Sequence, residues 1–145
     1  PKQFSMANSY STIAENPSVE TYIRLRVESG LSAMSAEAAA RGLPNSLFAV
    51  QVLAGDQPIG MGRVVGDGGC FYQVTDICVL PTHRGKGLGK LIMAEVVKHL
   101  DQNLSDTSYV SLIADGDAQH LYAQYGFVLT APRSAAMALR RKRPA

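Results

Sequence analysis

One stretch of the sequence, residues 74–98, limits what the chain can fold into more than any other. It begins with an apolar, β-prone run that stops at Pro81, continues through a loop that contains Gly85, Gly87 and Gly89, and leads into an amphipathic helical pattern. A strand that enters a helix through a glycine-rich turn directs several backbone N–H groups and the positive end of the helix dipole at one small volume. The stretch therefore predicts a site for a phosphorylated ligand.

Length and composition indicate one globular domain. The chain has 145 residues, of which 46% are hydrophobic and 18% are charged, so we expect a single domain over residues 1–145 and no extended disorder. No apolar run approaches the ~20 residues of a transmembrane helix, and the N-terminus lacks the pattern of a secretory signal. We expect a cytoplasmic protein with no membrane partner.

Charge and cysteine content argue against two other classes of partner. The net charge of +2 is too small to indicate nucleic acid binding, and the basic run 140–143 is interpreted as a solvated tail. Cys70 and Cys78 are predicted on one strand, roughly 26 Å apart, which is too far for a disulfide. We expect both to be buried, reduced thiols, and we expect no structural zinc site or other metal site.

Hydrophobic periodicity and turn residues predict a mixed α/β sheet, with antiparallel strands first and a parallel pair later. The expected strands are residues 9–14, 47–53, 59–65, 71–80, 108–114, 127–130 and 135–139. The expected helices are residues 35–42, 89–100, 118–125 and a first helix from Val19 to a stop at Gly30. The strand, helix and strand from 71 to 114 form a βαβ unit, which should be right-handed. Residues 1–8 show no periodicity and are predicted to be irregular.

The glycine loop does not match two common phosphate-binding patterns. A nucleotide-triphosphate loop needs G-x-x-x-x-G-K-[ST], but here Lys90 stands five residues after Gly85 and no Ser or Thr follows it. The dinucleotide pattern G-x-G-x-x-G has a different spacing. Three basic residues, Arg84, Lys86 and Lys90, lie within the loop or beside it.

The loop instead resembles the signature of the GNAT superfamily of acyl-CoA-dependent N-acyltransferases, [Q/R]-x-x-G-x-[G/A], which reads Arg84-Gly-Lys-Gly-Leu-Gly89 here. The preceding run Ile77–Pro81 is similar to the strand that this family places before its loop. The later run Leu121–Phe127 is similar to the family's Leu-Tyr-x-x-x-Gly-Phe element. The resemblance extends over roughly residues 9–139. It implies a GNAT-like sheet whose parallel βαβ unit is splayed around acetyl-CoA.

The resemblance also implies which residues hold acetyl-CoA as co-substrate. The pantetheine arm would lie between the two splayed strands and pair with the backbone of Ile77, Cys78 and Val79. The pyrophosphate would bind the loop amides, with charge added by Arg84 and Lys90. The loop residues are Gly85, Lys86, Gly87, Leu88, Gly89 and Lys90.

The chemistry implied by the resemblance is direct attack of a neutral amine on the thioester, without an acyl-enzyme. Tyr122 stands at the family's tyrosine position and is expected to protonate the departing thiolate, although a tyrosine on a short helix can also serve packing alone. The N–H of Val79 is the expected oxyanion donor. Tyr125 is interpreted as a packing residue.

Asp76 is the second catalytic candidate, because it interrupts an apolar strand and a buried carboxylate needs a partner. A substrate ammonium or a proton-relaying water would satisfy it, and so would a hydrogen bond to backbone or to Arg63; both alternatives stay open. If the strand bulges here, as it does in the family, alternation does not show which face Asp76 occupies.

Several residues depart from the family pattern or carry no expected role. Gln73 stands where many members have a glutamate base, and Asp115 stands where many have an asparagine. Deprotonation would then use Asp76 and water, or the free amine in bulk solvent. His83, His99 and His120 are interpreted as surface residues.

The resemblance also implies that the first two helices and the turn 66–69 frame the acceptor side. These parts and the neighbouring strand carry Tyr22, Arg24, Arg26, Arg63 and Asp67. An amine favours Asp67 or Asp76, and an acidic acceptor favours the arginines. We favour a small-molecule primary amine, with a homodimer as a further expectation. The alternatives are a protein lysine or N-terminal acetyltransferase and a non-catalytic acyl-CoA-binding module.

Overall fold

The computed structural model describes residues 9–139 and residue 141, in two compact units that meet between Leu112 and Ile113 in the sequence. Each unit is described by itself. The predicted irregular end at residues 1–8 lies outside the described residues, as does the basic run 140–143 except for residue 141, which is exposed.

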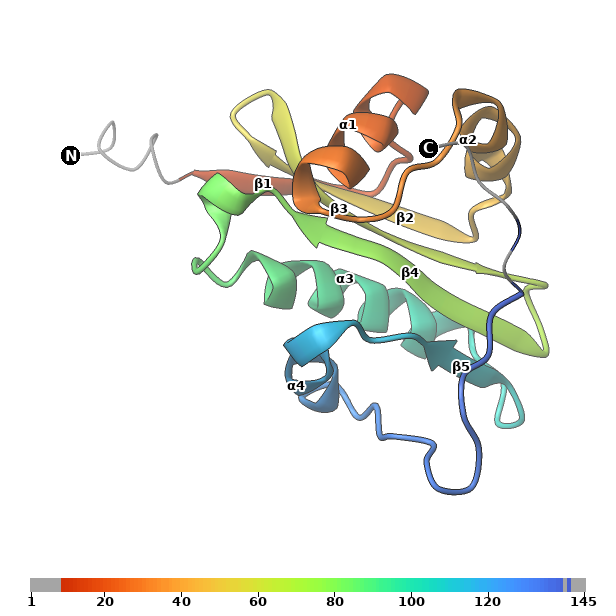
Figure 1. Ribbon diagram of the computed structural model, residues 1–145. Coiled ribbons are helices and arrows are strands. Elements are labelled where there is room, and N and C mark those ends of the chain that lie inside the picture. The colour runs from red at the N-terminus through yellow and green to blue at the C-terminus, as the bar shows by residue number, and fades with distance from the viewer. Residues whose placement is uncertain (1–8, 140, 142–145) are drawn as a thin grey trace. The chain divides into compact units, whose positions relative to one another are not determined.

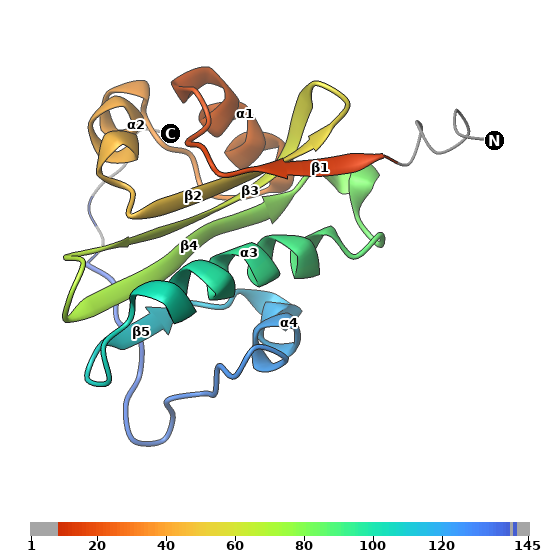
Figure 2. The ribbon, with the colours of Figure 1, turned by 180° about the vertical axis from the view of Figure 1, so that it is seen from behind.

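The first unit is a five-stranded sheet with helices on both faces. Its elements are β1 (Tyr10–Ile13), α1 (Val19–Ser29), α2 (Ala36–Gly42), η2 (Leu43–Asn45), β2 (Phe48–Ala54), β3 (Gln57–Gly66), β4 (Phe71–Val79), η3 (Pro81–His83), α3 (Leu88–Asn103) and β5 (Tyr109–Leu112). The strand order is β1-β2-β3-β4-β5. The first four strands are antiparallel and β5 runs parallel to β4, which confirms the predicted mixed sheet. Helices α1 and α2 lie on one face and α3 on the other (Figures 1 and 2).

The helices begin and end where capping residues stand. Ser18 and Ser35 cap α1 and α2, because each hydroxyl accepts a backbone N–H three residues on, at 3.1 and 3.0 Å. Gly30 ends α1 in the left-handed conformation, with φ of 89°. The apolar faces of α1 and α3 and both faces of the central strands form the core. Its fully buried residues include Leu25, Val50, Val52, Met61, Val64, Ile92, Met93 and Val96.

Strand β4 contains a bulge at Asp76 and Ile77. Arg63 lies opposite Thr75 and Met61 lies opposite Cys78, so Gly62 alone faces two residues of β4. Asp76 has φ of 62°, which is unusual for a residue other than glycine. A Cβ on Gly62 would lie 2.7 Å from both Ile77 Cδ1 and Ile92 Cγ2. The bulge therefore needs a glycine on the neighbouring strand.

Pairing between β4 and β5 stops well before β4 ends. The register runs from Phe71 opposite Tyr109 to Val74 opposite Leu112, whereas β4 continues to Val79. One edge of β4, from Thr75 to Val79, is therefore not paired with β5. Unpaired strand edges present N–H and C=O groups that can bind a further extended chain.

The second unit, described over residues 113–139 and at 141, contains η4 (Gly116–Ala118) and α4 (Gln119–Ala123). Gly126 follows α4 with φ of 92°, as expected for a helix end. The predictions of strands at 127–130 and 135–139 were wrong, since these residues have irregular backbone. Val128, Leu129, Met137 and Leu139 are exposed, and a β-prone segment forms no strand unless another strand pairs with it.

Candidate functional site

The glycine loop enters α3 through two left-handed residues. Gly85 and Gly87 have φ of 79° and 80°, and Gly87 is the N-cap of the helix with no side-chain cap. A Cβ on either glycine would meet nothing within 4 Å, so backbone conformation requires glycine here and the space beside the loop is open. The first-turn N–H groups of a helix have no acceptor within the helix. The loop therefore has the features that bind a phosphate.

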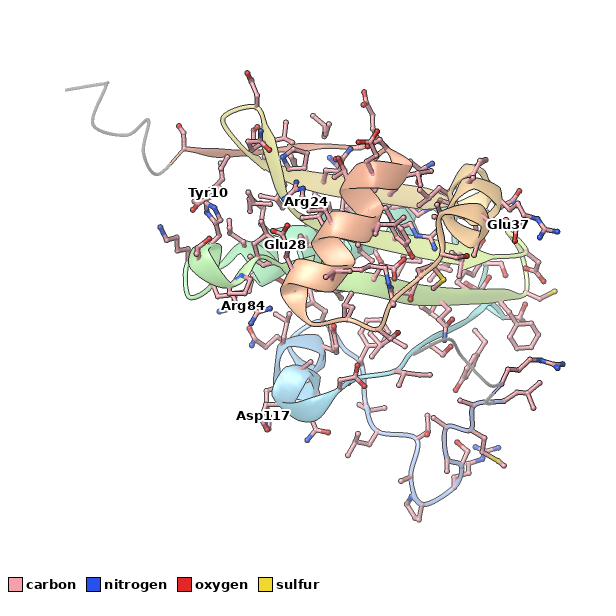
Figure 3. The ribbon with its side chains drawn as sticks, turned by 45° about the horizontal axis from the view of Figure 1, so that its top comes forward. Tyr10, Arg24, Glu28, Glu37, Arg84 and Asp117 are labelled. Carbon is pink, nitrogen blue, oxygen red and sulfur yellow. The ribbon has the colours of Figure 1, made fainter. Side chains whose placement is uncertain are left out.

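Arg84 fixes the loop to two other elements. Its Nε donates to Val79 O at 3.0 Å, and its Nη2 donates to Ser29 O at 2.9 Å. The guanidinium thus joins the end of β4 to the last residue of α1, where a positive charge also favours the helix dipole. Figure 3 shows Arg84 at the end of the sheet where the loop lies. A contact of Arg84 with a pyrophosphate stays a prediction.

Tyr10 makes a second connection to the loop, which sequence reasoning missed. Its hydroxyl and His83 Nδ1 are 2.8 Å apart, and Lys86 Nζ lies 5.9 Å from the centre of its ring. His83 is partly buried, and its hydrogen-bond partner lies on β1. These contacts connect η3 and the first part of the loop to β1.

The backbone of Val79 faces the open edge of β4. Leu80 donates its N–H to Ile59 O at 2.8 Å, toward β3, and successive residues of a strand direct their N–H groups to opposite edges. The carbonyl of Val79 accepts from Arg84 on that other side. The carbonyl of Cys78 instead faces β3, since a Cβ on Gly60 would lie 3.0 Å from it. The open edge thus offers Val79 and, by the same alternation, Ile77, but not the backbone of Cys78.

The two cysteines differ in their surroundings. Cys78 is buried, and its Sγ lies 3.9 Å from Leu25 O on α1. Burial raises the pKa of Cys78 to about 11, so the thiol is protonated near neutral pH and is a poor nucleophile. Cys70 is exposed, contrary to the prediction, because it lies in the turn before β4 and not on the strand. Both cysteines are free.

Asp76 is the centre of a buried charged group, which we call the Asp76 cluster: Tyr22, Arg26, Arg63 and Asp76. The Tyr22 hydroxyl and Arg63 Nε each donate to Asp76 Oδ2 at 2.8 Å, and Arg26 Nη1 donates to Oδ1. The Asp76 side chain is only 4% exposed. Both guanidinium groups also lie near the Tyr22 ring, 5.7 and 5.4 Å from its centre.

Of the two alternatives for Asp76, the cluster corresponds to the structural one, in which the carboxylate accepts a hydrogen bond from Arg63. Three donors already satisfy the carboxylate, so a substrate ammonium is not needed to offset its burial. Burial, followed by the hydrogen bond to Asp76, raises the pKa of Tyr22 above its usual value. One sequence feature indicates that Tyr22 and Arg26 act together: they are four residues apart, which places both side chains on one face of α1.

The other charged candidates of the acceptor side also have partners. Asp67 Oδ1 accepts the backbone N–H groups of Gly69, Cys70 and Phe71 at 2.8, 2.8 and 3.1 Å, and these bonds lower the pKa of Asp67. Arg24 donates to Pro58 O at 2.8 Å, and its Nη1 lies 3.7 Å from Glu28 Oε1 (Figure 3). Asp67 therefore stabilises the turn before β4.

Tyr122 lies on α4 in the second unit and is 8% exposed. Its ring packs edge to face on Phe127, with 6.5 Å between ring centres. Packing was the alternative role for Tyr122, and this contact corresponds to it. The role of Tyr122 as general acid stays a prediction. Tyr125 is partly buried.

The remaining histidines and a pocket show no catalytic arrangement. His120 is exposed, whereas His99 stacks on Phe48 with 4.6 Å between ring centres. A pocket of about 320 Å³ between the start of α1 and α2 has no charged side chain in its lining. Among the described residues, no three His, Cys, Asp or Glu side chains could together hold a metal ion, and no helix is long and apolar enough to cross a bilayer.

Comparison with known proteins gives matches of one kind. The model of the acetyltransferase (GNAT) domain matches residues 18–140. An uncharacterized N-acetyltransferase from Porphyra purpurea is 31% identical over 70 residues, which are 48% of this chain and 39% of that protein. GCN5-related N-acetyltransferase 2 from Arabidopsis thaliana is 35% identical over 69 residues, which are 48% of this chain and 26% of that protein. The matched segments thus span well under half of these relatives.

Solved structures extend the similarity to most of the chain. A protein of unknown function from Staphylococcus aureus, named a probable acetyltransferase, is 41% identical with a TM-score of 0.88, and the match covers 92% of this chain and 100% of that one. A GNAT family acetyltransferase from Streptococcus pneumoniae has the same fold, with 22% identity, a TM-score of 0.74 and coverage of 94% and 100%. With its strand, glycine loop and helix and its match over residues 18–140, the chain belongs to the GNAT acetyltransferase family.

Proposed function

We propose that the protein transfers an acetyl group from acetyl-CoA to a primary amine of a small molecule, by direct attack and without an acyl-enzyme. One observation carries the proposal. Strand β4 continues to Val79 after its pairing with β5 has ended at Val74, and the left-handed glycines of the α3 loop follow at once. An open strand edge beside a phosphate-binding loop fits an extended pantetheine arm joined to a pyrophosphate.

The residues proposed to hold acetyl-CoA are those of this edge and loop: Ile77, Cys78, Val79, Arg84, Gly85, Lys86, Gly87, Leu88, Gly89 and Lys90. Within this set, the direction of the backbone supports Ile77 and Val79 as hydrogen-bonding partners of the arm, whereas Cys78 would contribute only shape. Bound acetyl-CoA supplies the thioester that is attacked.

Three groups of the chain are proposed to support the chemistry. The N–H of Val79 faces the open edge and would stabilise the oxyanion. Tyr122 would donate a proton to the departing thiolate. The high pKa of Cys78 argues against an acyl-enzyme at that residue. For Asp76, the sequence left open a base, an anchor for the ammonium or a structural group, and its three donors favour a positioning role at the bulge.

We further propose one acetyltransferase domain made by the whole chain, in a reducing compartment such as the cytoplasm, because both cysteines are free. The exposed apolar side chains at 128, 129, 137 and 139 support a homodimer. Sedimentation velocity measures this directly, and a monomer at all concentrations would exclude it.

The test of the function is release of CoA thiol from acetyl-CoA across a panel of amines and peptides. We expect a small primary amine to give the highest kcat/KM. If a lysine peptide or a peptide N-terminus exceeds every small amine by a wide margin, the protein is a protein acetyltransferase instead. If acetyl-CoA raises the Tm but no amine releases thiol, the chain is a non-catalytic acyl-CoA-binding module.

A further inference from the structure

We propose that the acceptor amine carries an anionic group, a carboxylate or a phosphate, and that this group binds Arg63 at the edge of the Asp76 cluster. This inference rests on the proposed function and names the class of its acceptor. It follows from the charge of the cluster, from the hydrogen bonds of its two arginines and from the position of Asp76 at the bulge of β4.

The Asp76 cluster holds more positive than negative charge. Arg26 and Arg63 both form their ion pairs with Asp76, so two guanidinium groups share one carboxylate. Their side chains are 8% and 11% exposed. Burial of a charge is costly unless an opposite charge is near. A second anion at this place would therefore be bound favourably.

The two arginines differ in how their donors are used. Every side-chain nitrogen of Arg26 donates: Nε to Ser32 O at 2.9 Å, Nη1 to Asp76, and Nη2 to Ser32 Oγ at 3.0 Å. Arg63 uses Nε for Asp76 at 2.8 Å and Nη1 for Ser46 Oγ at 2.7 Å. No hydrogen bond joins Arg63 Nη2 to any residue of the described chain. Arg63 thus keeps a donor for an anionic oxygen.

The position of the cluster agrees with an acceptor site. Phosphates bound at the loop after Val79 would place the pantetheine arm along β4 in the direction of Asp76, so its reactive end would lie near the bulge. Arg63 lies on β3 opposite Thr75, beside that bulge and one strand away from the open edge. An anion bound at Arg63 would therefore hold a neighbouring amine close to the thioester.

The acidic residues do not offer an equivalent site for an ammonium. Asp76 accepts three side-chain donors, and Asp67 Oδ1 accepts three backbone N–H groups. A simple alkylamine or a polyamine has no anion to bind the remaining donor of Arg63. An amine with a carboxylate or phosphate nearby satisfies that donor and the excess charge together.

The first experiment uses the wild-type protein and matched pairs of acceptors. One arm compares amino acids with their amides, and the other compares aminoalkyl phosphates with alkylamines of equal length. We expect kcat/KM to be at least about tenfold higher for the anionic member in one arm, the effect of one charge-assisted hydrogen bond; the arm that responds identifies carboxylate or phosphate. Equal or faster turnover of the uncharged members in both arms would overturn the inference.

The second experiment tests Arg63 itself. We expect Arg63→Gln to lower kcat/KM for the anionic member by about tenfold or more and for its uncharged partner by much less, and Arg63→Lys to restore part of the preference. The matched control is Arg41→Gln, because Arg41 is an exposed arginine of α2. This variant should keep the preference for the anionic acceptor. Equal losses for both members would show that Arg63 is structural only.

Loss of all activity and misfolding of the variant are distinguished from a wrong acceptor class. If no amine releases thiol from acetyl-CoA, the proposed function fails before the acceptor class is tested. If Arg63→Gln does not fold, as judged by its thermal transition, the wild-type pairs still decide between an anionic and an uncharged acceptor.

Discussion

At the scale of single residues, Asp76 balances the charge of the two arginines buried with it. We expect Asp76→Asn to lower the free energy of unfolding by about 3–5 kcal/mol, because it leaves buried guanidinium groups without a counter-charge. Urea denaturation measures the loss. Asp67→Asn is the control, since its amide oxygen can still accept the backbone N–H groups of an exposed turn, and its effect should be much smaller. Equal losses of stability in the two variants would show that the buried ion pairs of Asp76 do not stabilise the fold.

His99 gives a second prediction at this scale. Burial lowers the pKa of His99 below its usual 6.5, so the unfolded chain binds a proton at a higher pH than the folded chain does. Stability should therefore fall as the pH drops from about 6.5 through the folded pKa, and level off below it. We expect the Tm of the wild type to fall more between pH 7.5 and 5.5 than the Tm of His99→Gln. Parallel Tm curves would exclude a contribution from His99.

At the scale of elements, the bulge of β4 depends on Gly62. A Cβ there would lie 2.7 Å from Ile77 Cδ1 and Ile92 Cγ2, and such overpacking costs about 1–3 kcal/mol. Because Ile77 lies on the edge proposed for pantetheine, we expect Gly62→Ala to raise KM for acetyl-CoA more than it lowers kcat. Gly42→Ala is the control, since its Cβ would meet nothing within 4 Å. An unchanged KM in Gly62→Ala would show that the bulge does not shape the edge.

The elements also show which features a sequence can predict. Strands β1 to β5 and the helices were predicted from local periodicity, serine caps and glycine stops. The glycine loop was predicted from its glycines and basic residues. The Asp76 cluster was predicted only in part, because Tyr22 and Arg26 stand 54 and 50 residues from Asp76 in the sequence. The strands predicted at 127–130 and 135–139 failed for a related reason. Strand formation depends on a partner segment, and β-propensity does not report whether one is present.

At the scale of the whole molecule, ligand binding and folding are linked, so acetyl-CoA should stabilise the protein. A ligand at 100 times its Kd adds about 2.7 kcal/mol to the free energy of unfolding. We expect the Tm of the wild type to rise with the logarithm of the acetyl-CoA concentration once that concentration exceeds Kd. Thermal unfolding at a series of acetyl-CoA concentrations measures this increase without any need for an acceptor.

Two glycines with the same positive φ separate the effect of backbone strain from the effect on binding. Gly87 in the loop and Gly68 in the turn before β4 both have φ of 80°, so alanine at either should cost about 1–2 kcal/mol of stability without ligand. Only Gly87→Ala alters the loop amides, so we expect it to lose most of the Tm increase with acetyl-CoA, whereas Gly68→Ala keeps it. If both variants keep the full increase, the phosphates bind elsewhere, and the open edge of β4 loses its proposed ligand as well.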